Sequence, residues 1–171
     1  MFRKSKSFTL IELLVAIFII GVLAALITSN VSRSRMKGRD ARRKADLNAI
    51  RTAVETYAME KGSLPGQDQS PRVCQYSAGG WCFSDGPWPS SLQTALQPYL
   101  YPLPKDPINA RPTGHNYMYR YTENPNTDPC RRPGAYKIDA ELEVTTDPDL
   151  TNDGGVTSTR YELGTAADCN L

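Results

Sequence analysis

The sequence predicts an α+β chain in which a long N-terminal helical stem packs against a small antiparallel sheet head. Phe8 to Ile27 is an apolar run of 20 residues, interrupted only by Thr9, Glu12 and Gly21. No proline occurs before Pro65, so a helix can continue well past this run. The last third of the chain then alternates apolar and polar residues with the period of strands. At 171 residues, the chain is the size of one ordinary domain.

The stem is expected to run from residue 8 to residue 61. Residues 8–27 would rise about 30 Å as a helix, which is the thickness of the hydrocarbon core of a bilayer. The second half of the stem has one apolar stripe at helical spacing, suited to packing on a head. That stripe consists of Leu47, Ile50, Val54 and Tyr57. Gly62 is a natural C-cap, and Pro65 prevents further continuation.

Charge is distributed unevenly between the stem and the head. Residues 28–61 hold nine Lys or Arg and four Asp or Glu, whereas residues 62–171 hold eight and thirteen. The basic cluster from Arg33 to Lys44 and the acidic head therefore predict charge complementarity between copies of the chain. Acidic lipid and nucleic acid are alternative partners for the cluster, and nucleic acid is the less expected of these readings.

Three interpretations of the N-terminus compete. The apolar run could be a signal peptide cleaved near Ala24, a permanent anchor, or a retained helix whose leader is cut off in front of it. A carboxylate at Glu12 is costly in hydrocarbon and indicates a functional site, which favours the third interpretation. Bases beyond the run outnumber those before it, so charge counting alone would orient the chain the opposite way.

The residues Lys6-Ser7-Phe8-Thr9-Leu10-Ile11-Glu12-Leu13-Leu14-Val15 resemble the prepilin signature shared by type IV pilins and type II secretion pseudopilins. The resemblance implies that a membrane prepilin peptidase cuts between Ser7 and Phe8 and methylates the new amino terminus. The family usually has Gly where this chain has Ser7. The expected parts are a leader (1–7), a stem (8–61, with 8–27 as membrane and filament core) and a globular head (62–171).

The same resemblance implies how the subunit assembles. Glu12 would pair with the amine of Phe8 on a neighbouring subunit as the helices leave the membrane and pack into a filament. The implied partners are the prepilin peptidase, the inner-membrane pilus assembly machinery and other copies of the chain in a helical polymer. The implied location is the cytoplasmic membrane before assembly and the cell surface or an extracellular pilus afterwards.

The head is predicted to contain three strands in an antiparallel sheet laid on the stem stripe. These strands are expected at residues 116–121, 135–144 and 160–163. In the second, Lys137, Asp139 and Glu141 alternate with apolar residues and face away from them. A short helix is expected at 90–100, capped by Ser90 or Ser91.

Four cysteines lie in the head, without the close spacing of a zinc site: Cys74, Cys82, Cys130 and Cys169. An even number of cysteines beyond an export signal indicates disulfides, with free thiols as the alternative. Of three connectivities, Cys74–Cys82 and Cys130–Cys169 are favoured, because the first closes a short loop and the second ties down the C-terminus.

The segment 147–155 is rich in oxygen ligands and partly matches a calcium loop read from Asp149 and including Asp153. Arg160 stands where the loop needs a bidentate Glu, so a simple turn is preferred to a calcium site. Major pseudopilins that resemble this head do bind calcium in the corresponding loop. No cofactor is otherwise expected.

The function expected first is that of a structural subunit of a type IV pilus in adhesion, motility or surface attachment. The alternative is a type II secretion pseudopilin acting in protein export, and a secreted adhesin cleaved near Ala24 is a third possibility. An enzyme is not expected, because the single histidine, His115, lies in a turn and no catalytic or phosphate-binding motif occurs.

Overall fold

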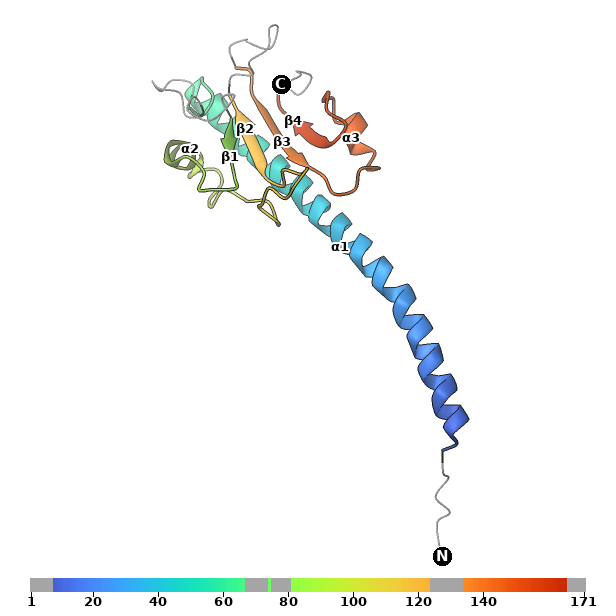
Figure 1. The fold of residues 1–171 in the computed structure, drawn as a ribbon. Helices are drawn as coiled ribbons and strands as arrows, with labels where there is room; N and C mark the ends of the chain where they lie inside the picture. Colours follow the sequence, from blue (N-terminus) through green and yellow to red (C-terminus); the bar gives the residue numbers. More distant parts are fainter. Residues whose placement is uncertain (1–7, 67–73, 75–80, 124–133, 166–171) are drawn as a thin grey trace, which may run out of the picture. The chain divides into compact units, whose positions relative to one another are not determined.

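The fold is seen in a computed structural model that describes residues 8–66, 74, 81–123 and 134–165, with the backbone alone at 26–30. The elements in chain order are α1 (Leu10–Lys61), β1 (Cys82–Phe83), α2 (Ser90–Leu96), β2 (Tyr119–Thr122), β3 (Lys137–Glu141), α3 (Asp149–Asn152) and β4 (Arg160–Leu163) (Figure 1). This confirms the predicted α+β class. The chain divides into two compact units, Met1–Gly38 and Arg39–Leu171, so the second half of α1 belongs with the head.

Helix α1 covers the predicted stem except for Phe8 and Thr9. It ends where the sequence indicates, because Gly62 adopts a φ of 73°, a left-handed conformation that glycine enters without steric cost. The amide of Gly62 donates to the carbonyl of Ala58 at 2.9 Å and so satisfies one of the last carbonyls of the helix.

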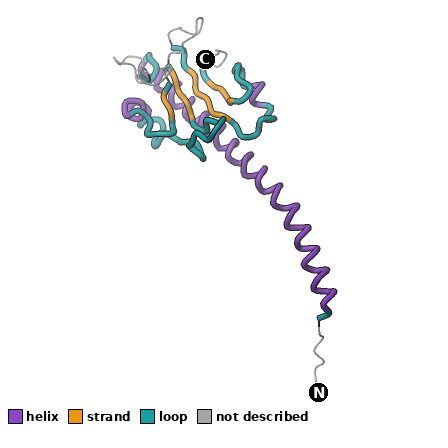
Figure 2. The backbone as a smooth tube through the Cα atoms, in the orientation of Figure 1, coloured by secondary structure: helices purple, strands orange, loops and turns teal. Residues whose placement is uncertain are grey.

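The sheet has four antiparallel strands in the order β1-β2-β3-β4 (orange in Figure 2), one more than predicted. The additional strand, β1, has only two residues and pairs Cys82 with Tyr121, which is too short to leave a period in the sequence. Strands β2 and β3 are shorter than predicted, whereas β4 has the predicted bounds. Helix α2 starts after Pro89 without a side-chain cap, so the predicted capping by Ser90 or Ser91 is wrong.

The core of the second unit forms where the apolar stripe of α1 meets the sheet and α2. The stripe residues Leu47, Ile50 and Val54 are 0–3% exposed. They pack with residues of the sheet and of the segment 88–96, namely Tyr119, Tyr121, Ile138, Ala140, Leu163, Trp88, Leu92 and Leu96. Burial of this stripe explains why residues 39–61 belong to the same unit as the sheet.

Candidate functional site

Helix α1 begins with a capping box at the position where the assembly site is expected. The amide and hydroxyl of Thr9 donate to one carboxylate oxygen of Glu12 at 2.9 and 2.7 Å, and the amide of Glu12 donates to the Thr9 hydroxyl at 3.3 Å. This reciprocal arrangement is the Thr-x-x-Glu box that satisfies unpaired donors at a helix start. It places Glu12 in the first turn of the helix, with its carboxylate turned back to Thr9, and leaves Phe8, 78% exposed, outside the helix.

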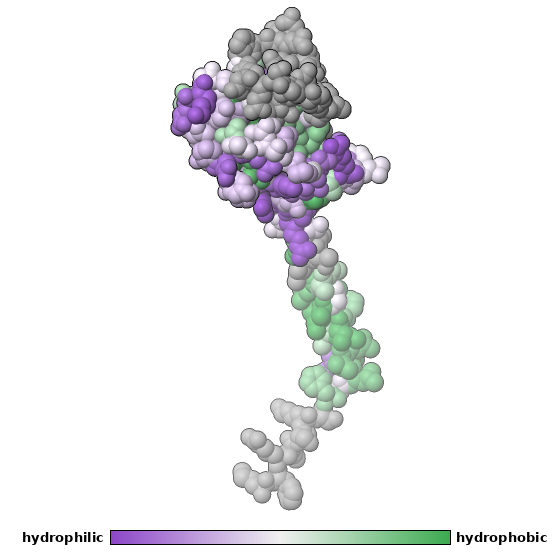
Figure 3. All heavy atoms as spheres, turned by 90° about the vertical axis from the view of Figure 1, so that its left-hand side faces the viewer, coloured by the Kyte–Doolittle hydropathy of each residue, from purple (hydrophilic) through white to green (hydrophobic). Residues whose placement is uncertain are grey.

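Large apolar side chains cover the first turns of α1 without a partner among the described residues (green in Figure 3). They are 48–80% exposed and comprise Phe8, Leu10, Ile11, Leu13, Leu14, Val15, Ile17, Phe18, Ile19, Ile20, Val22 and Leu23. An apolar surface of this extent marks a site of contact with lipid or protein.

Within the part of the chain that the structure describes, no helix is both long and apolar enough to cross a membrane.

A buried ionic cluster fixes the second half of α1 to two loops of the head. The fully buried guanidinium of Arg43 donates to Asp106 (Nε–Oδ2, 2.6 Å), to Asp40 (Nη1–Oδ1, 2.7 Å) and to Glu143 (Nη1–Oε1, 2.7 Å). Arg39 also binds Glu143, through Nη2 and Nε of its guanidinium. Hydrogen bonds from Arg39 outweigh burial and, with those from Arg43, lower the pKa of Glu143 below its usual value.

The opposite face of the sheet carries a second set of buried ion pairs. Asp139 is fully buried and accepts from Arg120 (2.7 and 2.6 Å) and from Arg160 (2.6 Å). Lys137, 1% exposed, pairs with Glu162 at 2.6 Å. Burial alone would raise the pKa of Asp139, but the charges of Arg160 and Arg120 lower it. Lys137 and Asp139 therefore face away from the stem, as expected, yet are buried, whereas Glu141 at the end of β3 is half-buried.

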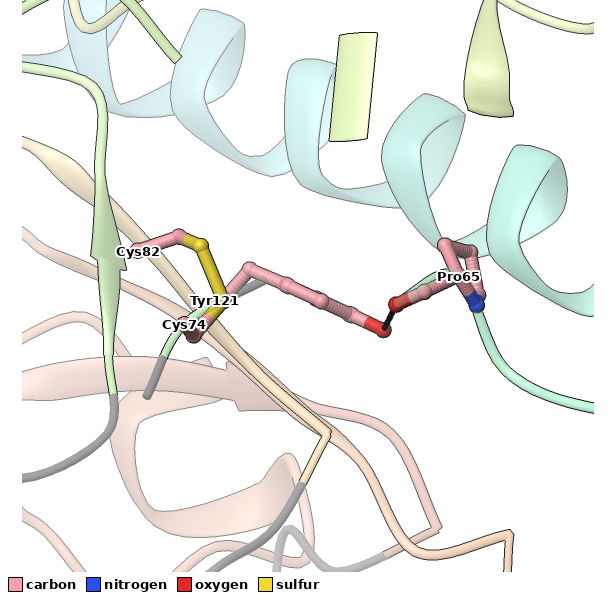
Figure 4. The surroundings of a disulfide bond; sticks show 4 residues. All are labelled: Pro65, Cys74, Cys82 and Tyr121. Atoms are coloured by element: carbon pink, nitrogen blue, oxygen red, sulfur yellow. Dashed lines mark hydrogen bonds between the residues drawn. A yellow bond between two sulfur atoms is a disulfide. The ribbon is translucent and has the colours of Figure 1, made fainter. Parts of the chain in front are cut away.

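Cys74 and Cys82 form a disulfide, which is the first of the two favoured pairings. Figure 4 shows it beside Tyr121, the register partner of Cys82 in β2. The hydroxyl of Tyr121 donates to the carbonyl of Pro65 at 3.2 Å, so this corner links β1, β2 and the segment that follows α1. The second pair, Cys130 and Cys169, lies outside the described residues.

Asp149 and Asp153, the two residues of the expected calcium loop, each have partners within the described residues. The ammonium of Lys44 bridges Asp147 and Asp149 at 2.7 and 2.6 Å. Asp153 accepts from the amides of Gly155 and Glu162 at 2.8 and 2.7 Å. Among the described residues, no group of three or more His, Cys, Asp or Glu could hold a metal ion. The expected oxygen-rich loop is therefore fixed by Lys44 and by its own amides.

The remaining features of the head have a structural character. A cavity of about 500 Å³ lies at the end of α1, lined in part by Glu55, Met59 and Tyr136, and the Tyr136 hydroxyl donates to Glu55 at 2.8 Å. His115 stacks on Tyr117 and contacts Glu141 through Nδ1 at 2.6 Å. Neither place brings together a nucleophile with a general base.

The N-terminus of the chain matches a known sequence motif. Residues 2–28 match the model of the prokaryotic N-terminal methylation motif. The chain is 27% identical to "Type II secretion system core protein G" of Vibrio cholerae over 127 residues, which cover 68% of this chain and 71% of the relative.

The chain thus carries the N-terminal methylation motif and is similar to type II secretion core protein G and to a type IV pilin.

Other relatives match to different extents. Core protein G of Pseudomonas aeruginosa is 29% identical over 117 residues, covering 68% of this chain and 74% of the relative. The "Type IV major pilin protein PilA" of Myxococcus xanthus is 34% identical over 58 residues, covering 34% of this chain and 26% of the relative. No solved structure matches the chain significantly.

The structure brings some of the predicted site residues together and adds others. It places Phe8 and Glu12 at the start of α1, while Ser7 lies outside the described residues. The contact of Thr9 with Glu12 was not expected, although Thr-x-x-Glu before an apolar run is a recognisable capping signal. The Arg43 cluster was also missed, because Asp106 and Glu143 lie 63 and 100 residues from Arg43 in sequence and share no local pattern with it.

Proposed function

We propose that this chain is a type II secretion pseudopilin, a structural and non-catalytic subunit of a short filament that acts in protein export. A prepilin peptidase would cut between Ser7 and Phe8 and methylate Phe8. The subunit would wait in the cytoplasmic membrane through its apolar run and then assemble with other copies. The sequence alone favoured a surface pilus, with the pseudopilin as the alternative, so this proposal reverses the preference.

The extent of the match to core protein G carries this choice. Alignments of 127 and 117 residues are more than twice the length of α1, which has 52 residues, so they extend into the head. The alignment to the pilin PilA, at 58 residues, is no longer than a leader and stem together. Because the stem is common to both classes, likeness beyond it favours the pseudopilin.

Glu12 is the residue proposed to set the position of each subunit in the filament. Its carboxylate lies at the exposed start of α1, where it would be open to the amine of a neighbouring Phe8. A buried ion pair adds little net stability, but an unpaired buried charge costs about 3–5 kcal/mol. The pair would therefore act by excluding packings in which the carboxylate and the amine do not meet.

Two measurements test the proposal. The first is the intact mass and N-terminal sequence of the mature protein, where N-methylated Phe8 is expected and a start near Ala25 or an uncut Met1 would contradict it. The second is deletion of the gene, followed by assays of protein secretion and of surface filaments. Loss of secretion without loss of surface filaments supports the pseudopilin. Loss of surface filaments with normal secretion would instead support the pilus, the second candidate, which the PilA match favours.

A further inference from the structure

We propose that three cations just beyond the apolar run, Arg33, Arg35 and Lys37, form a basic belt that binds the anionic headgroups of the membrane in which the subunit is stored. This inference rests on the proposed function, since it requires the run to lie in a bilayer before assembly. The belt lies within the unit Met1–Gly38, as does the described part of the run.

The belt differs from the cations that follow it in having no carboxylate partner. Arg33, Arg35 and Lys37 are exposed, and none forms an ion pair within the described part of the chain. The next five cations along α1 all lie within 4.0 Å of a carboxylate: Arg39, Arg42, Arg43, Lys44 and Arg51. Unpaired positive charge on this helix is thus confined, among residues 31–51, to the part nearest the apolar run.

The head offers this belt little free negative charge. Of fourteen Asp and Glu described between Arg39 and Thr165, eleven lie within 4.0 Å of a Lys or Arg of the head unit itself. Glu60 accepts from the Tyr99 hydroxyl, and Asp153 accepts from backbone amides. Most described carboxylates of the head are therefore already paired within the same head. They are not free to bind the belt of another copy, so a different anionic partner fits the belt better.

The position of the belt along α1 matches the headgroup layer. Arg33 and Lys37 lie about 9 and 15 Å beyond Ile27 along a helix axis. The headgroup region extends roughly 5–8 Å past the hydrocarbon core, and long basic side chains bend back toward it. All three charges consequently lie within about one Debye length of the phosphates at physiological salt.

The distribution of the belt around the helix also favours lipid. At about 100° per residue, Arg35 lies roughly 200° from Arg33, whereas Lys37 lies about 40° from it. The charges therefore point to opposite sides of α1. A neighbouring protein or a nucleic acid strand would contact one side of the helix, whereas a headgroup layer surrounds it.

The experiment is a lipid titration of the protein expressed as the full chain and purified in detergent from its native membrane after processing, read by native mass spectrometry. The probes are phosphatidylglycerol and phosphatidylcholine with the same acyl chains. Wild type should prefer phosphatidylglycerol, and the triple variant R33Q/R35Q/K37Q should reduce that preference by about a hundredfold, at about fivefold for each of the three charges. The matched control R42Q/K61Q/K105Q removes the same charge from exposed positions of the other unit and should stay within twofold of wild type.

Several results would overturn the belt. One is an equal lipid preference in the triple variant and in wild type, and another is an equal loss of preference in the matched control. A triple variant that keeps its lipid preference but fails to form filaments would assign the charges to contacts between subunits. Tighter binding of a DNA duplex than of phosphatidylglycerol, lost in the triple variant, would assign them to nucleic acid. The mass of the same samples separates the two proposals, because a start other than Phe8 contradicts the proposed function, whereas unchanged lipid preference in a chain starting at Phe8 contradicts only the belt.

Discussion

Glu12 has two separable properties, a hydrogen-bonding geometry and a charge. In the single subunit its carboxylate accepts from the amide and hydroxyl of Thr9 and so begins α1 at Leu10. In the proposed filament its charge meets the amine of a neighbour. Gln can occupy the same position of a capping box, so the two properties can be tested apart.

We predict that Glu12→Gln keeps the start of α1 but prevents filament assembly. Thr9→Ala should weaken the helix start by about 1 kcal/mol, the usual cost of losing a cap, while assembly persists because the charge remains. Amide hydrogen exchange at Leu13, whose amide donates to the Thr9 carbonyl at 3.3 Å, reports the helix start. Sedimentation of filaments reports assembly. Normal filaments from Glu12→Gln would remove the proposed role of the charge.

Loss of the Asp139 charge should destabilise the head strongly. The variant Asp139→Asn would leave Arg120 and Arg160 near an uncharged partner in a buried site, at a cost of about 3–5 kcal/mol. Urea denaturation measures this loss. The control is Asp149→Asn, whose side chain is 50% exposed and whose ion pair should contribute well under 1 kcal/mol. Equal stability of the two variants would contradict the importance of the buried pairs.

The dependence of the free energy of unfolding on pH should reveal the titration of Asp139. The pKa of Asp139 is lowered in the folded protein, so its contribution is fully present above its unfolded pKa of about 4. That contribution decreases as the pH falls toward the lower folded pKa. Wild type should therefore lose stability below about pH 4 more steeply than Asp139→Asn, which lacks this titration.

At the scale of elements, the disulfide should hold β1 to the sheet. Strand β1 has two residues, and the Cys74–Cys82 loop has a separation of eight. Replacing both cysteines by Ser should lower the free energy of unfolding by roughly 2–3 kcal/mol, the chain-entropy value for a loop of this size. The amide of Ser84, which donates to the Tyr119 carbonyl at 3.0 Å, should exchange faster, whereas the amides between β3 and β4 should not. Uniform acceleration across the sheet would contradict a local role.

The loop around α3 should not respond to calcium. Lys44 already lies between Asp147 and Asp149, and both oxygens of Asp153 accept from amides. Millimolar calcium should leave the melting temperature of wild type unchanged. In Lys44→Gln the two carboxylates lose their cation, so the melting temperature should fall and should partly recover on adding calcium. A calcium-dependent rise in wild type would show that the ion displaces Lys44.

An element could be predicted from the sequence where the residues that determine it lie close together in the chain. The long helix, its end at Gly62 and strand β4 were evident because periodicity and turn chemistry act over a few neighbouring residues. Strand β1 could not be found, since two residues have no period and their pairing depends on Tyr121, far along the chain. The burial of Lys137 and Asp139 was equally inaccessible, because alternation indicates which face a residue takes but not what covers that face.

At the scale of the whole molecule, the two compact units have different surfaces. The described part of Met1–Gly38 has exposed apolar side chains and an unpaired basic belt, whereas Arg39–Leu171 contains the buried core and both buried ionic clusters. Assembly would thus depend on the first unit, and stability of the head on the second. This division predicts where the chain can be cut without unfolding the head.

A fragment beginning at Arg39 should fold without the preceding residues, because every buried residue of the described core lies at or beyond Asp40. We expect a cooperative thermal transition and a monomer in the absence of detergent, measured by circular dichroism and light scattering. A fragment beginning at Leu47 is the matched comparison. It keeps the whole apolar stripe but lacks Arg43, so Asp106 and Glu143 lose their buried partner at a cost of about 3–5 kcal/mol. That loss is a large part of the stability of a small domain, so the shorter fragment should melt at a much lower temperature or remain unfolded. Equal melting of the two fragments would mean that the apolar stripe alone attaches the helix to the sheet, and that the Arg43 cluster contributes little to the fold.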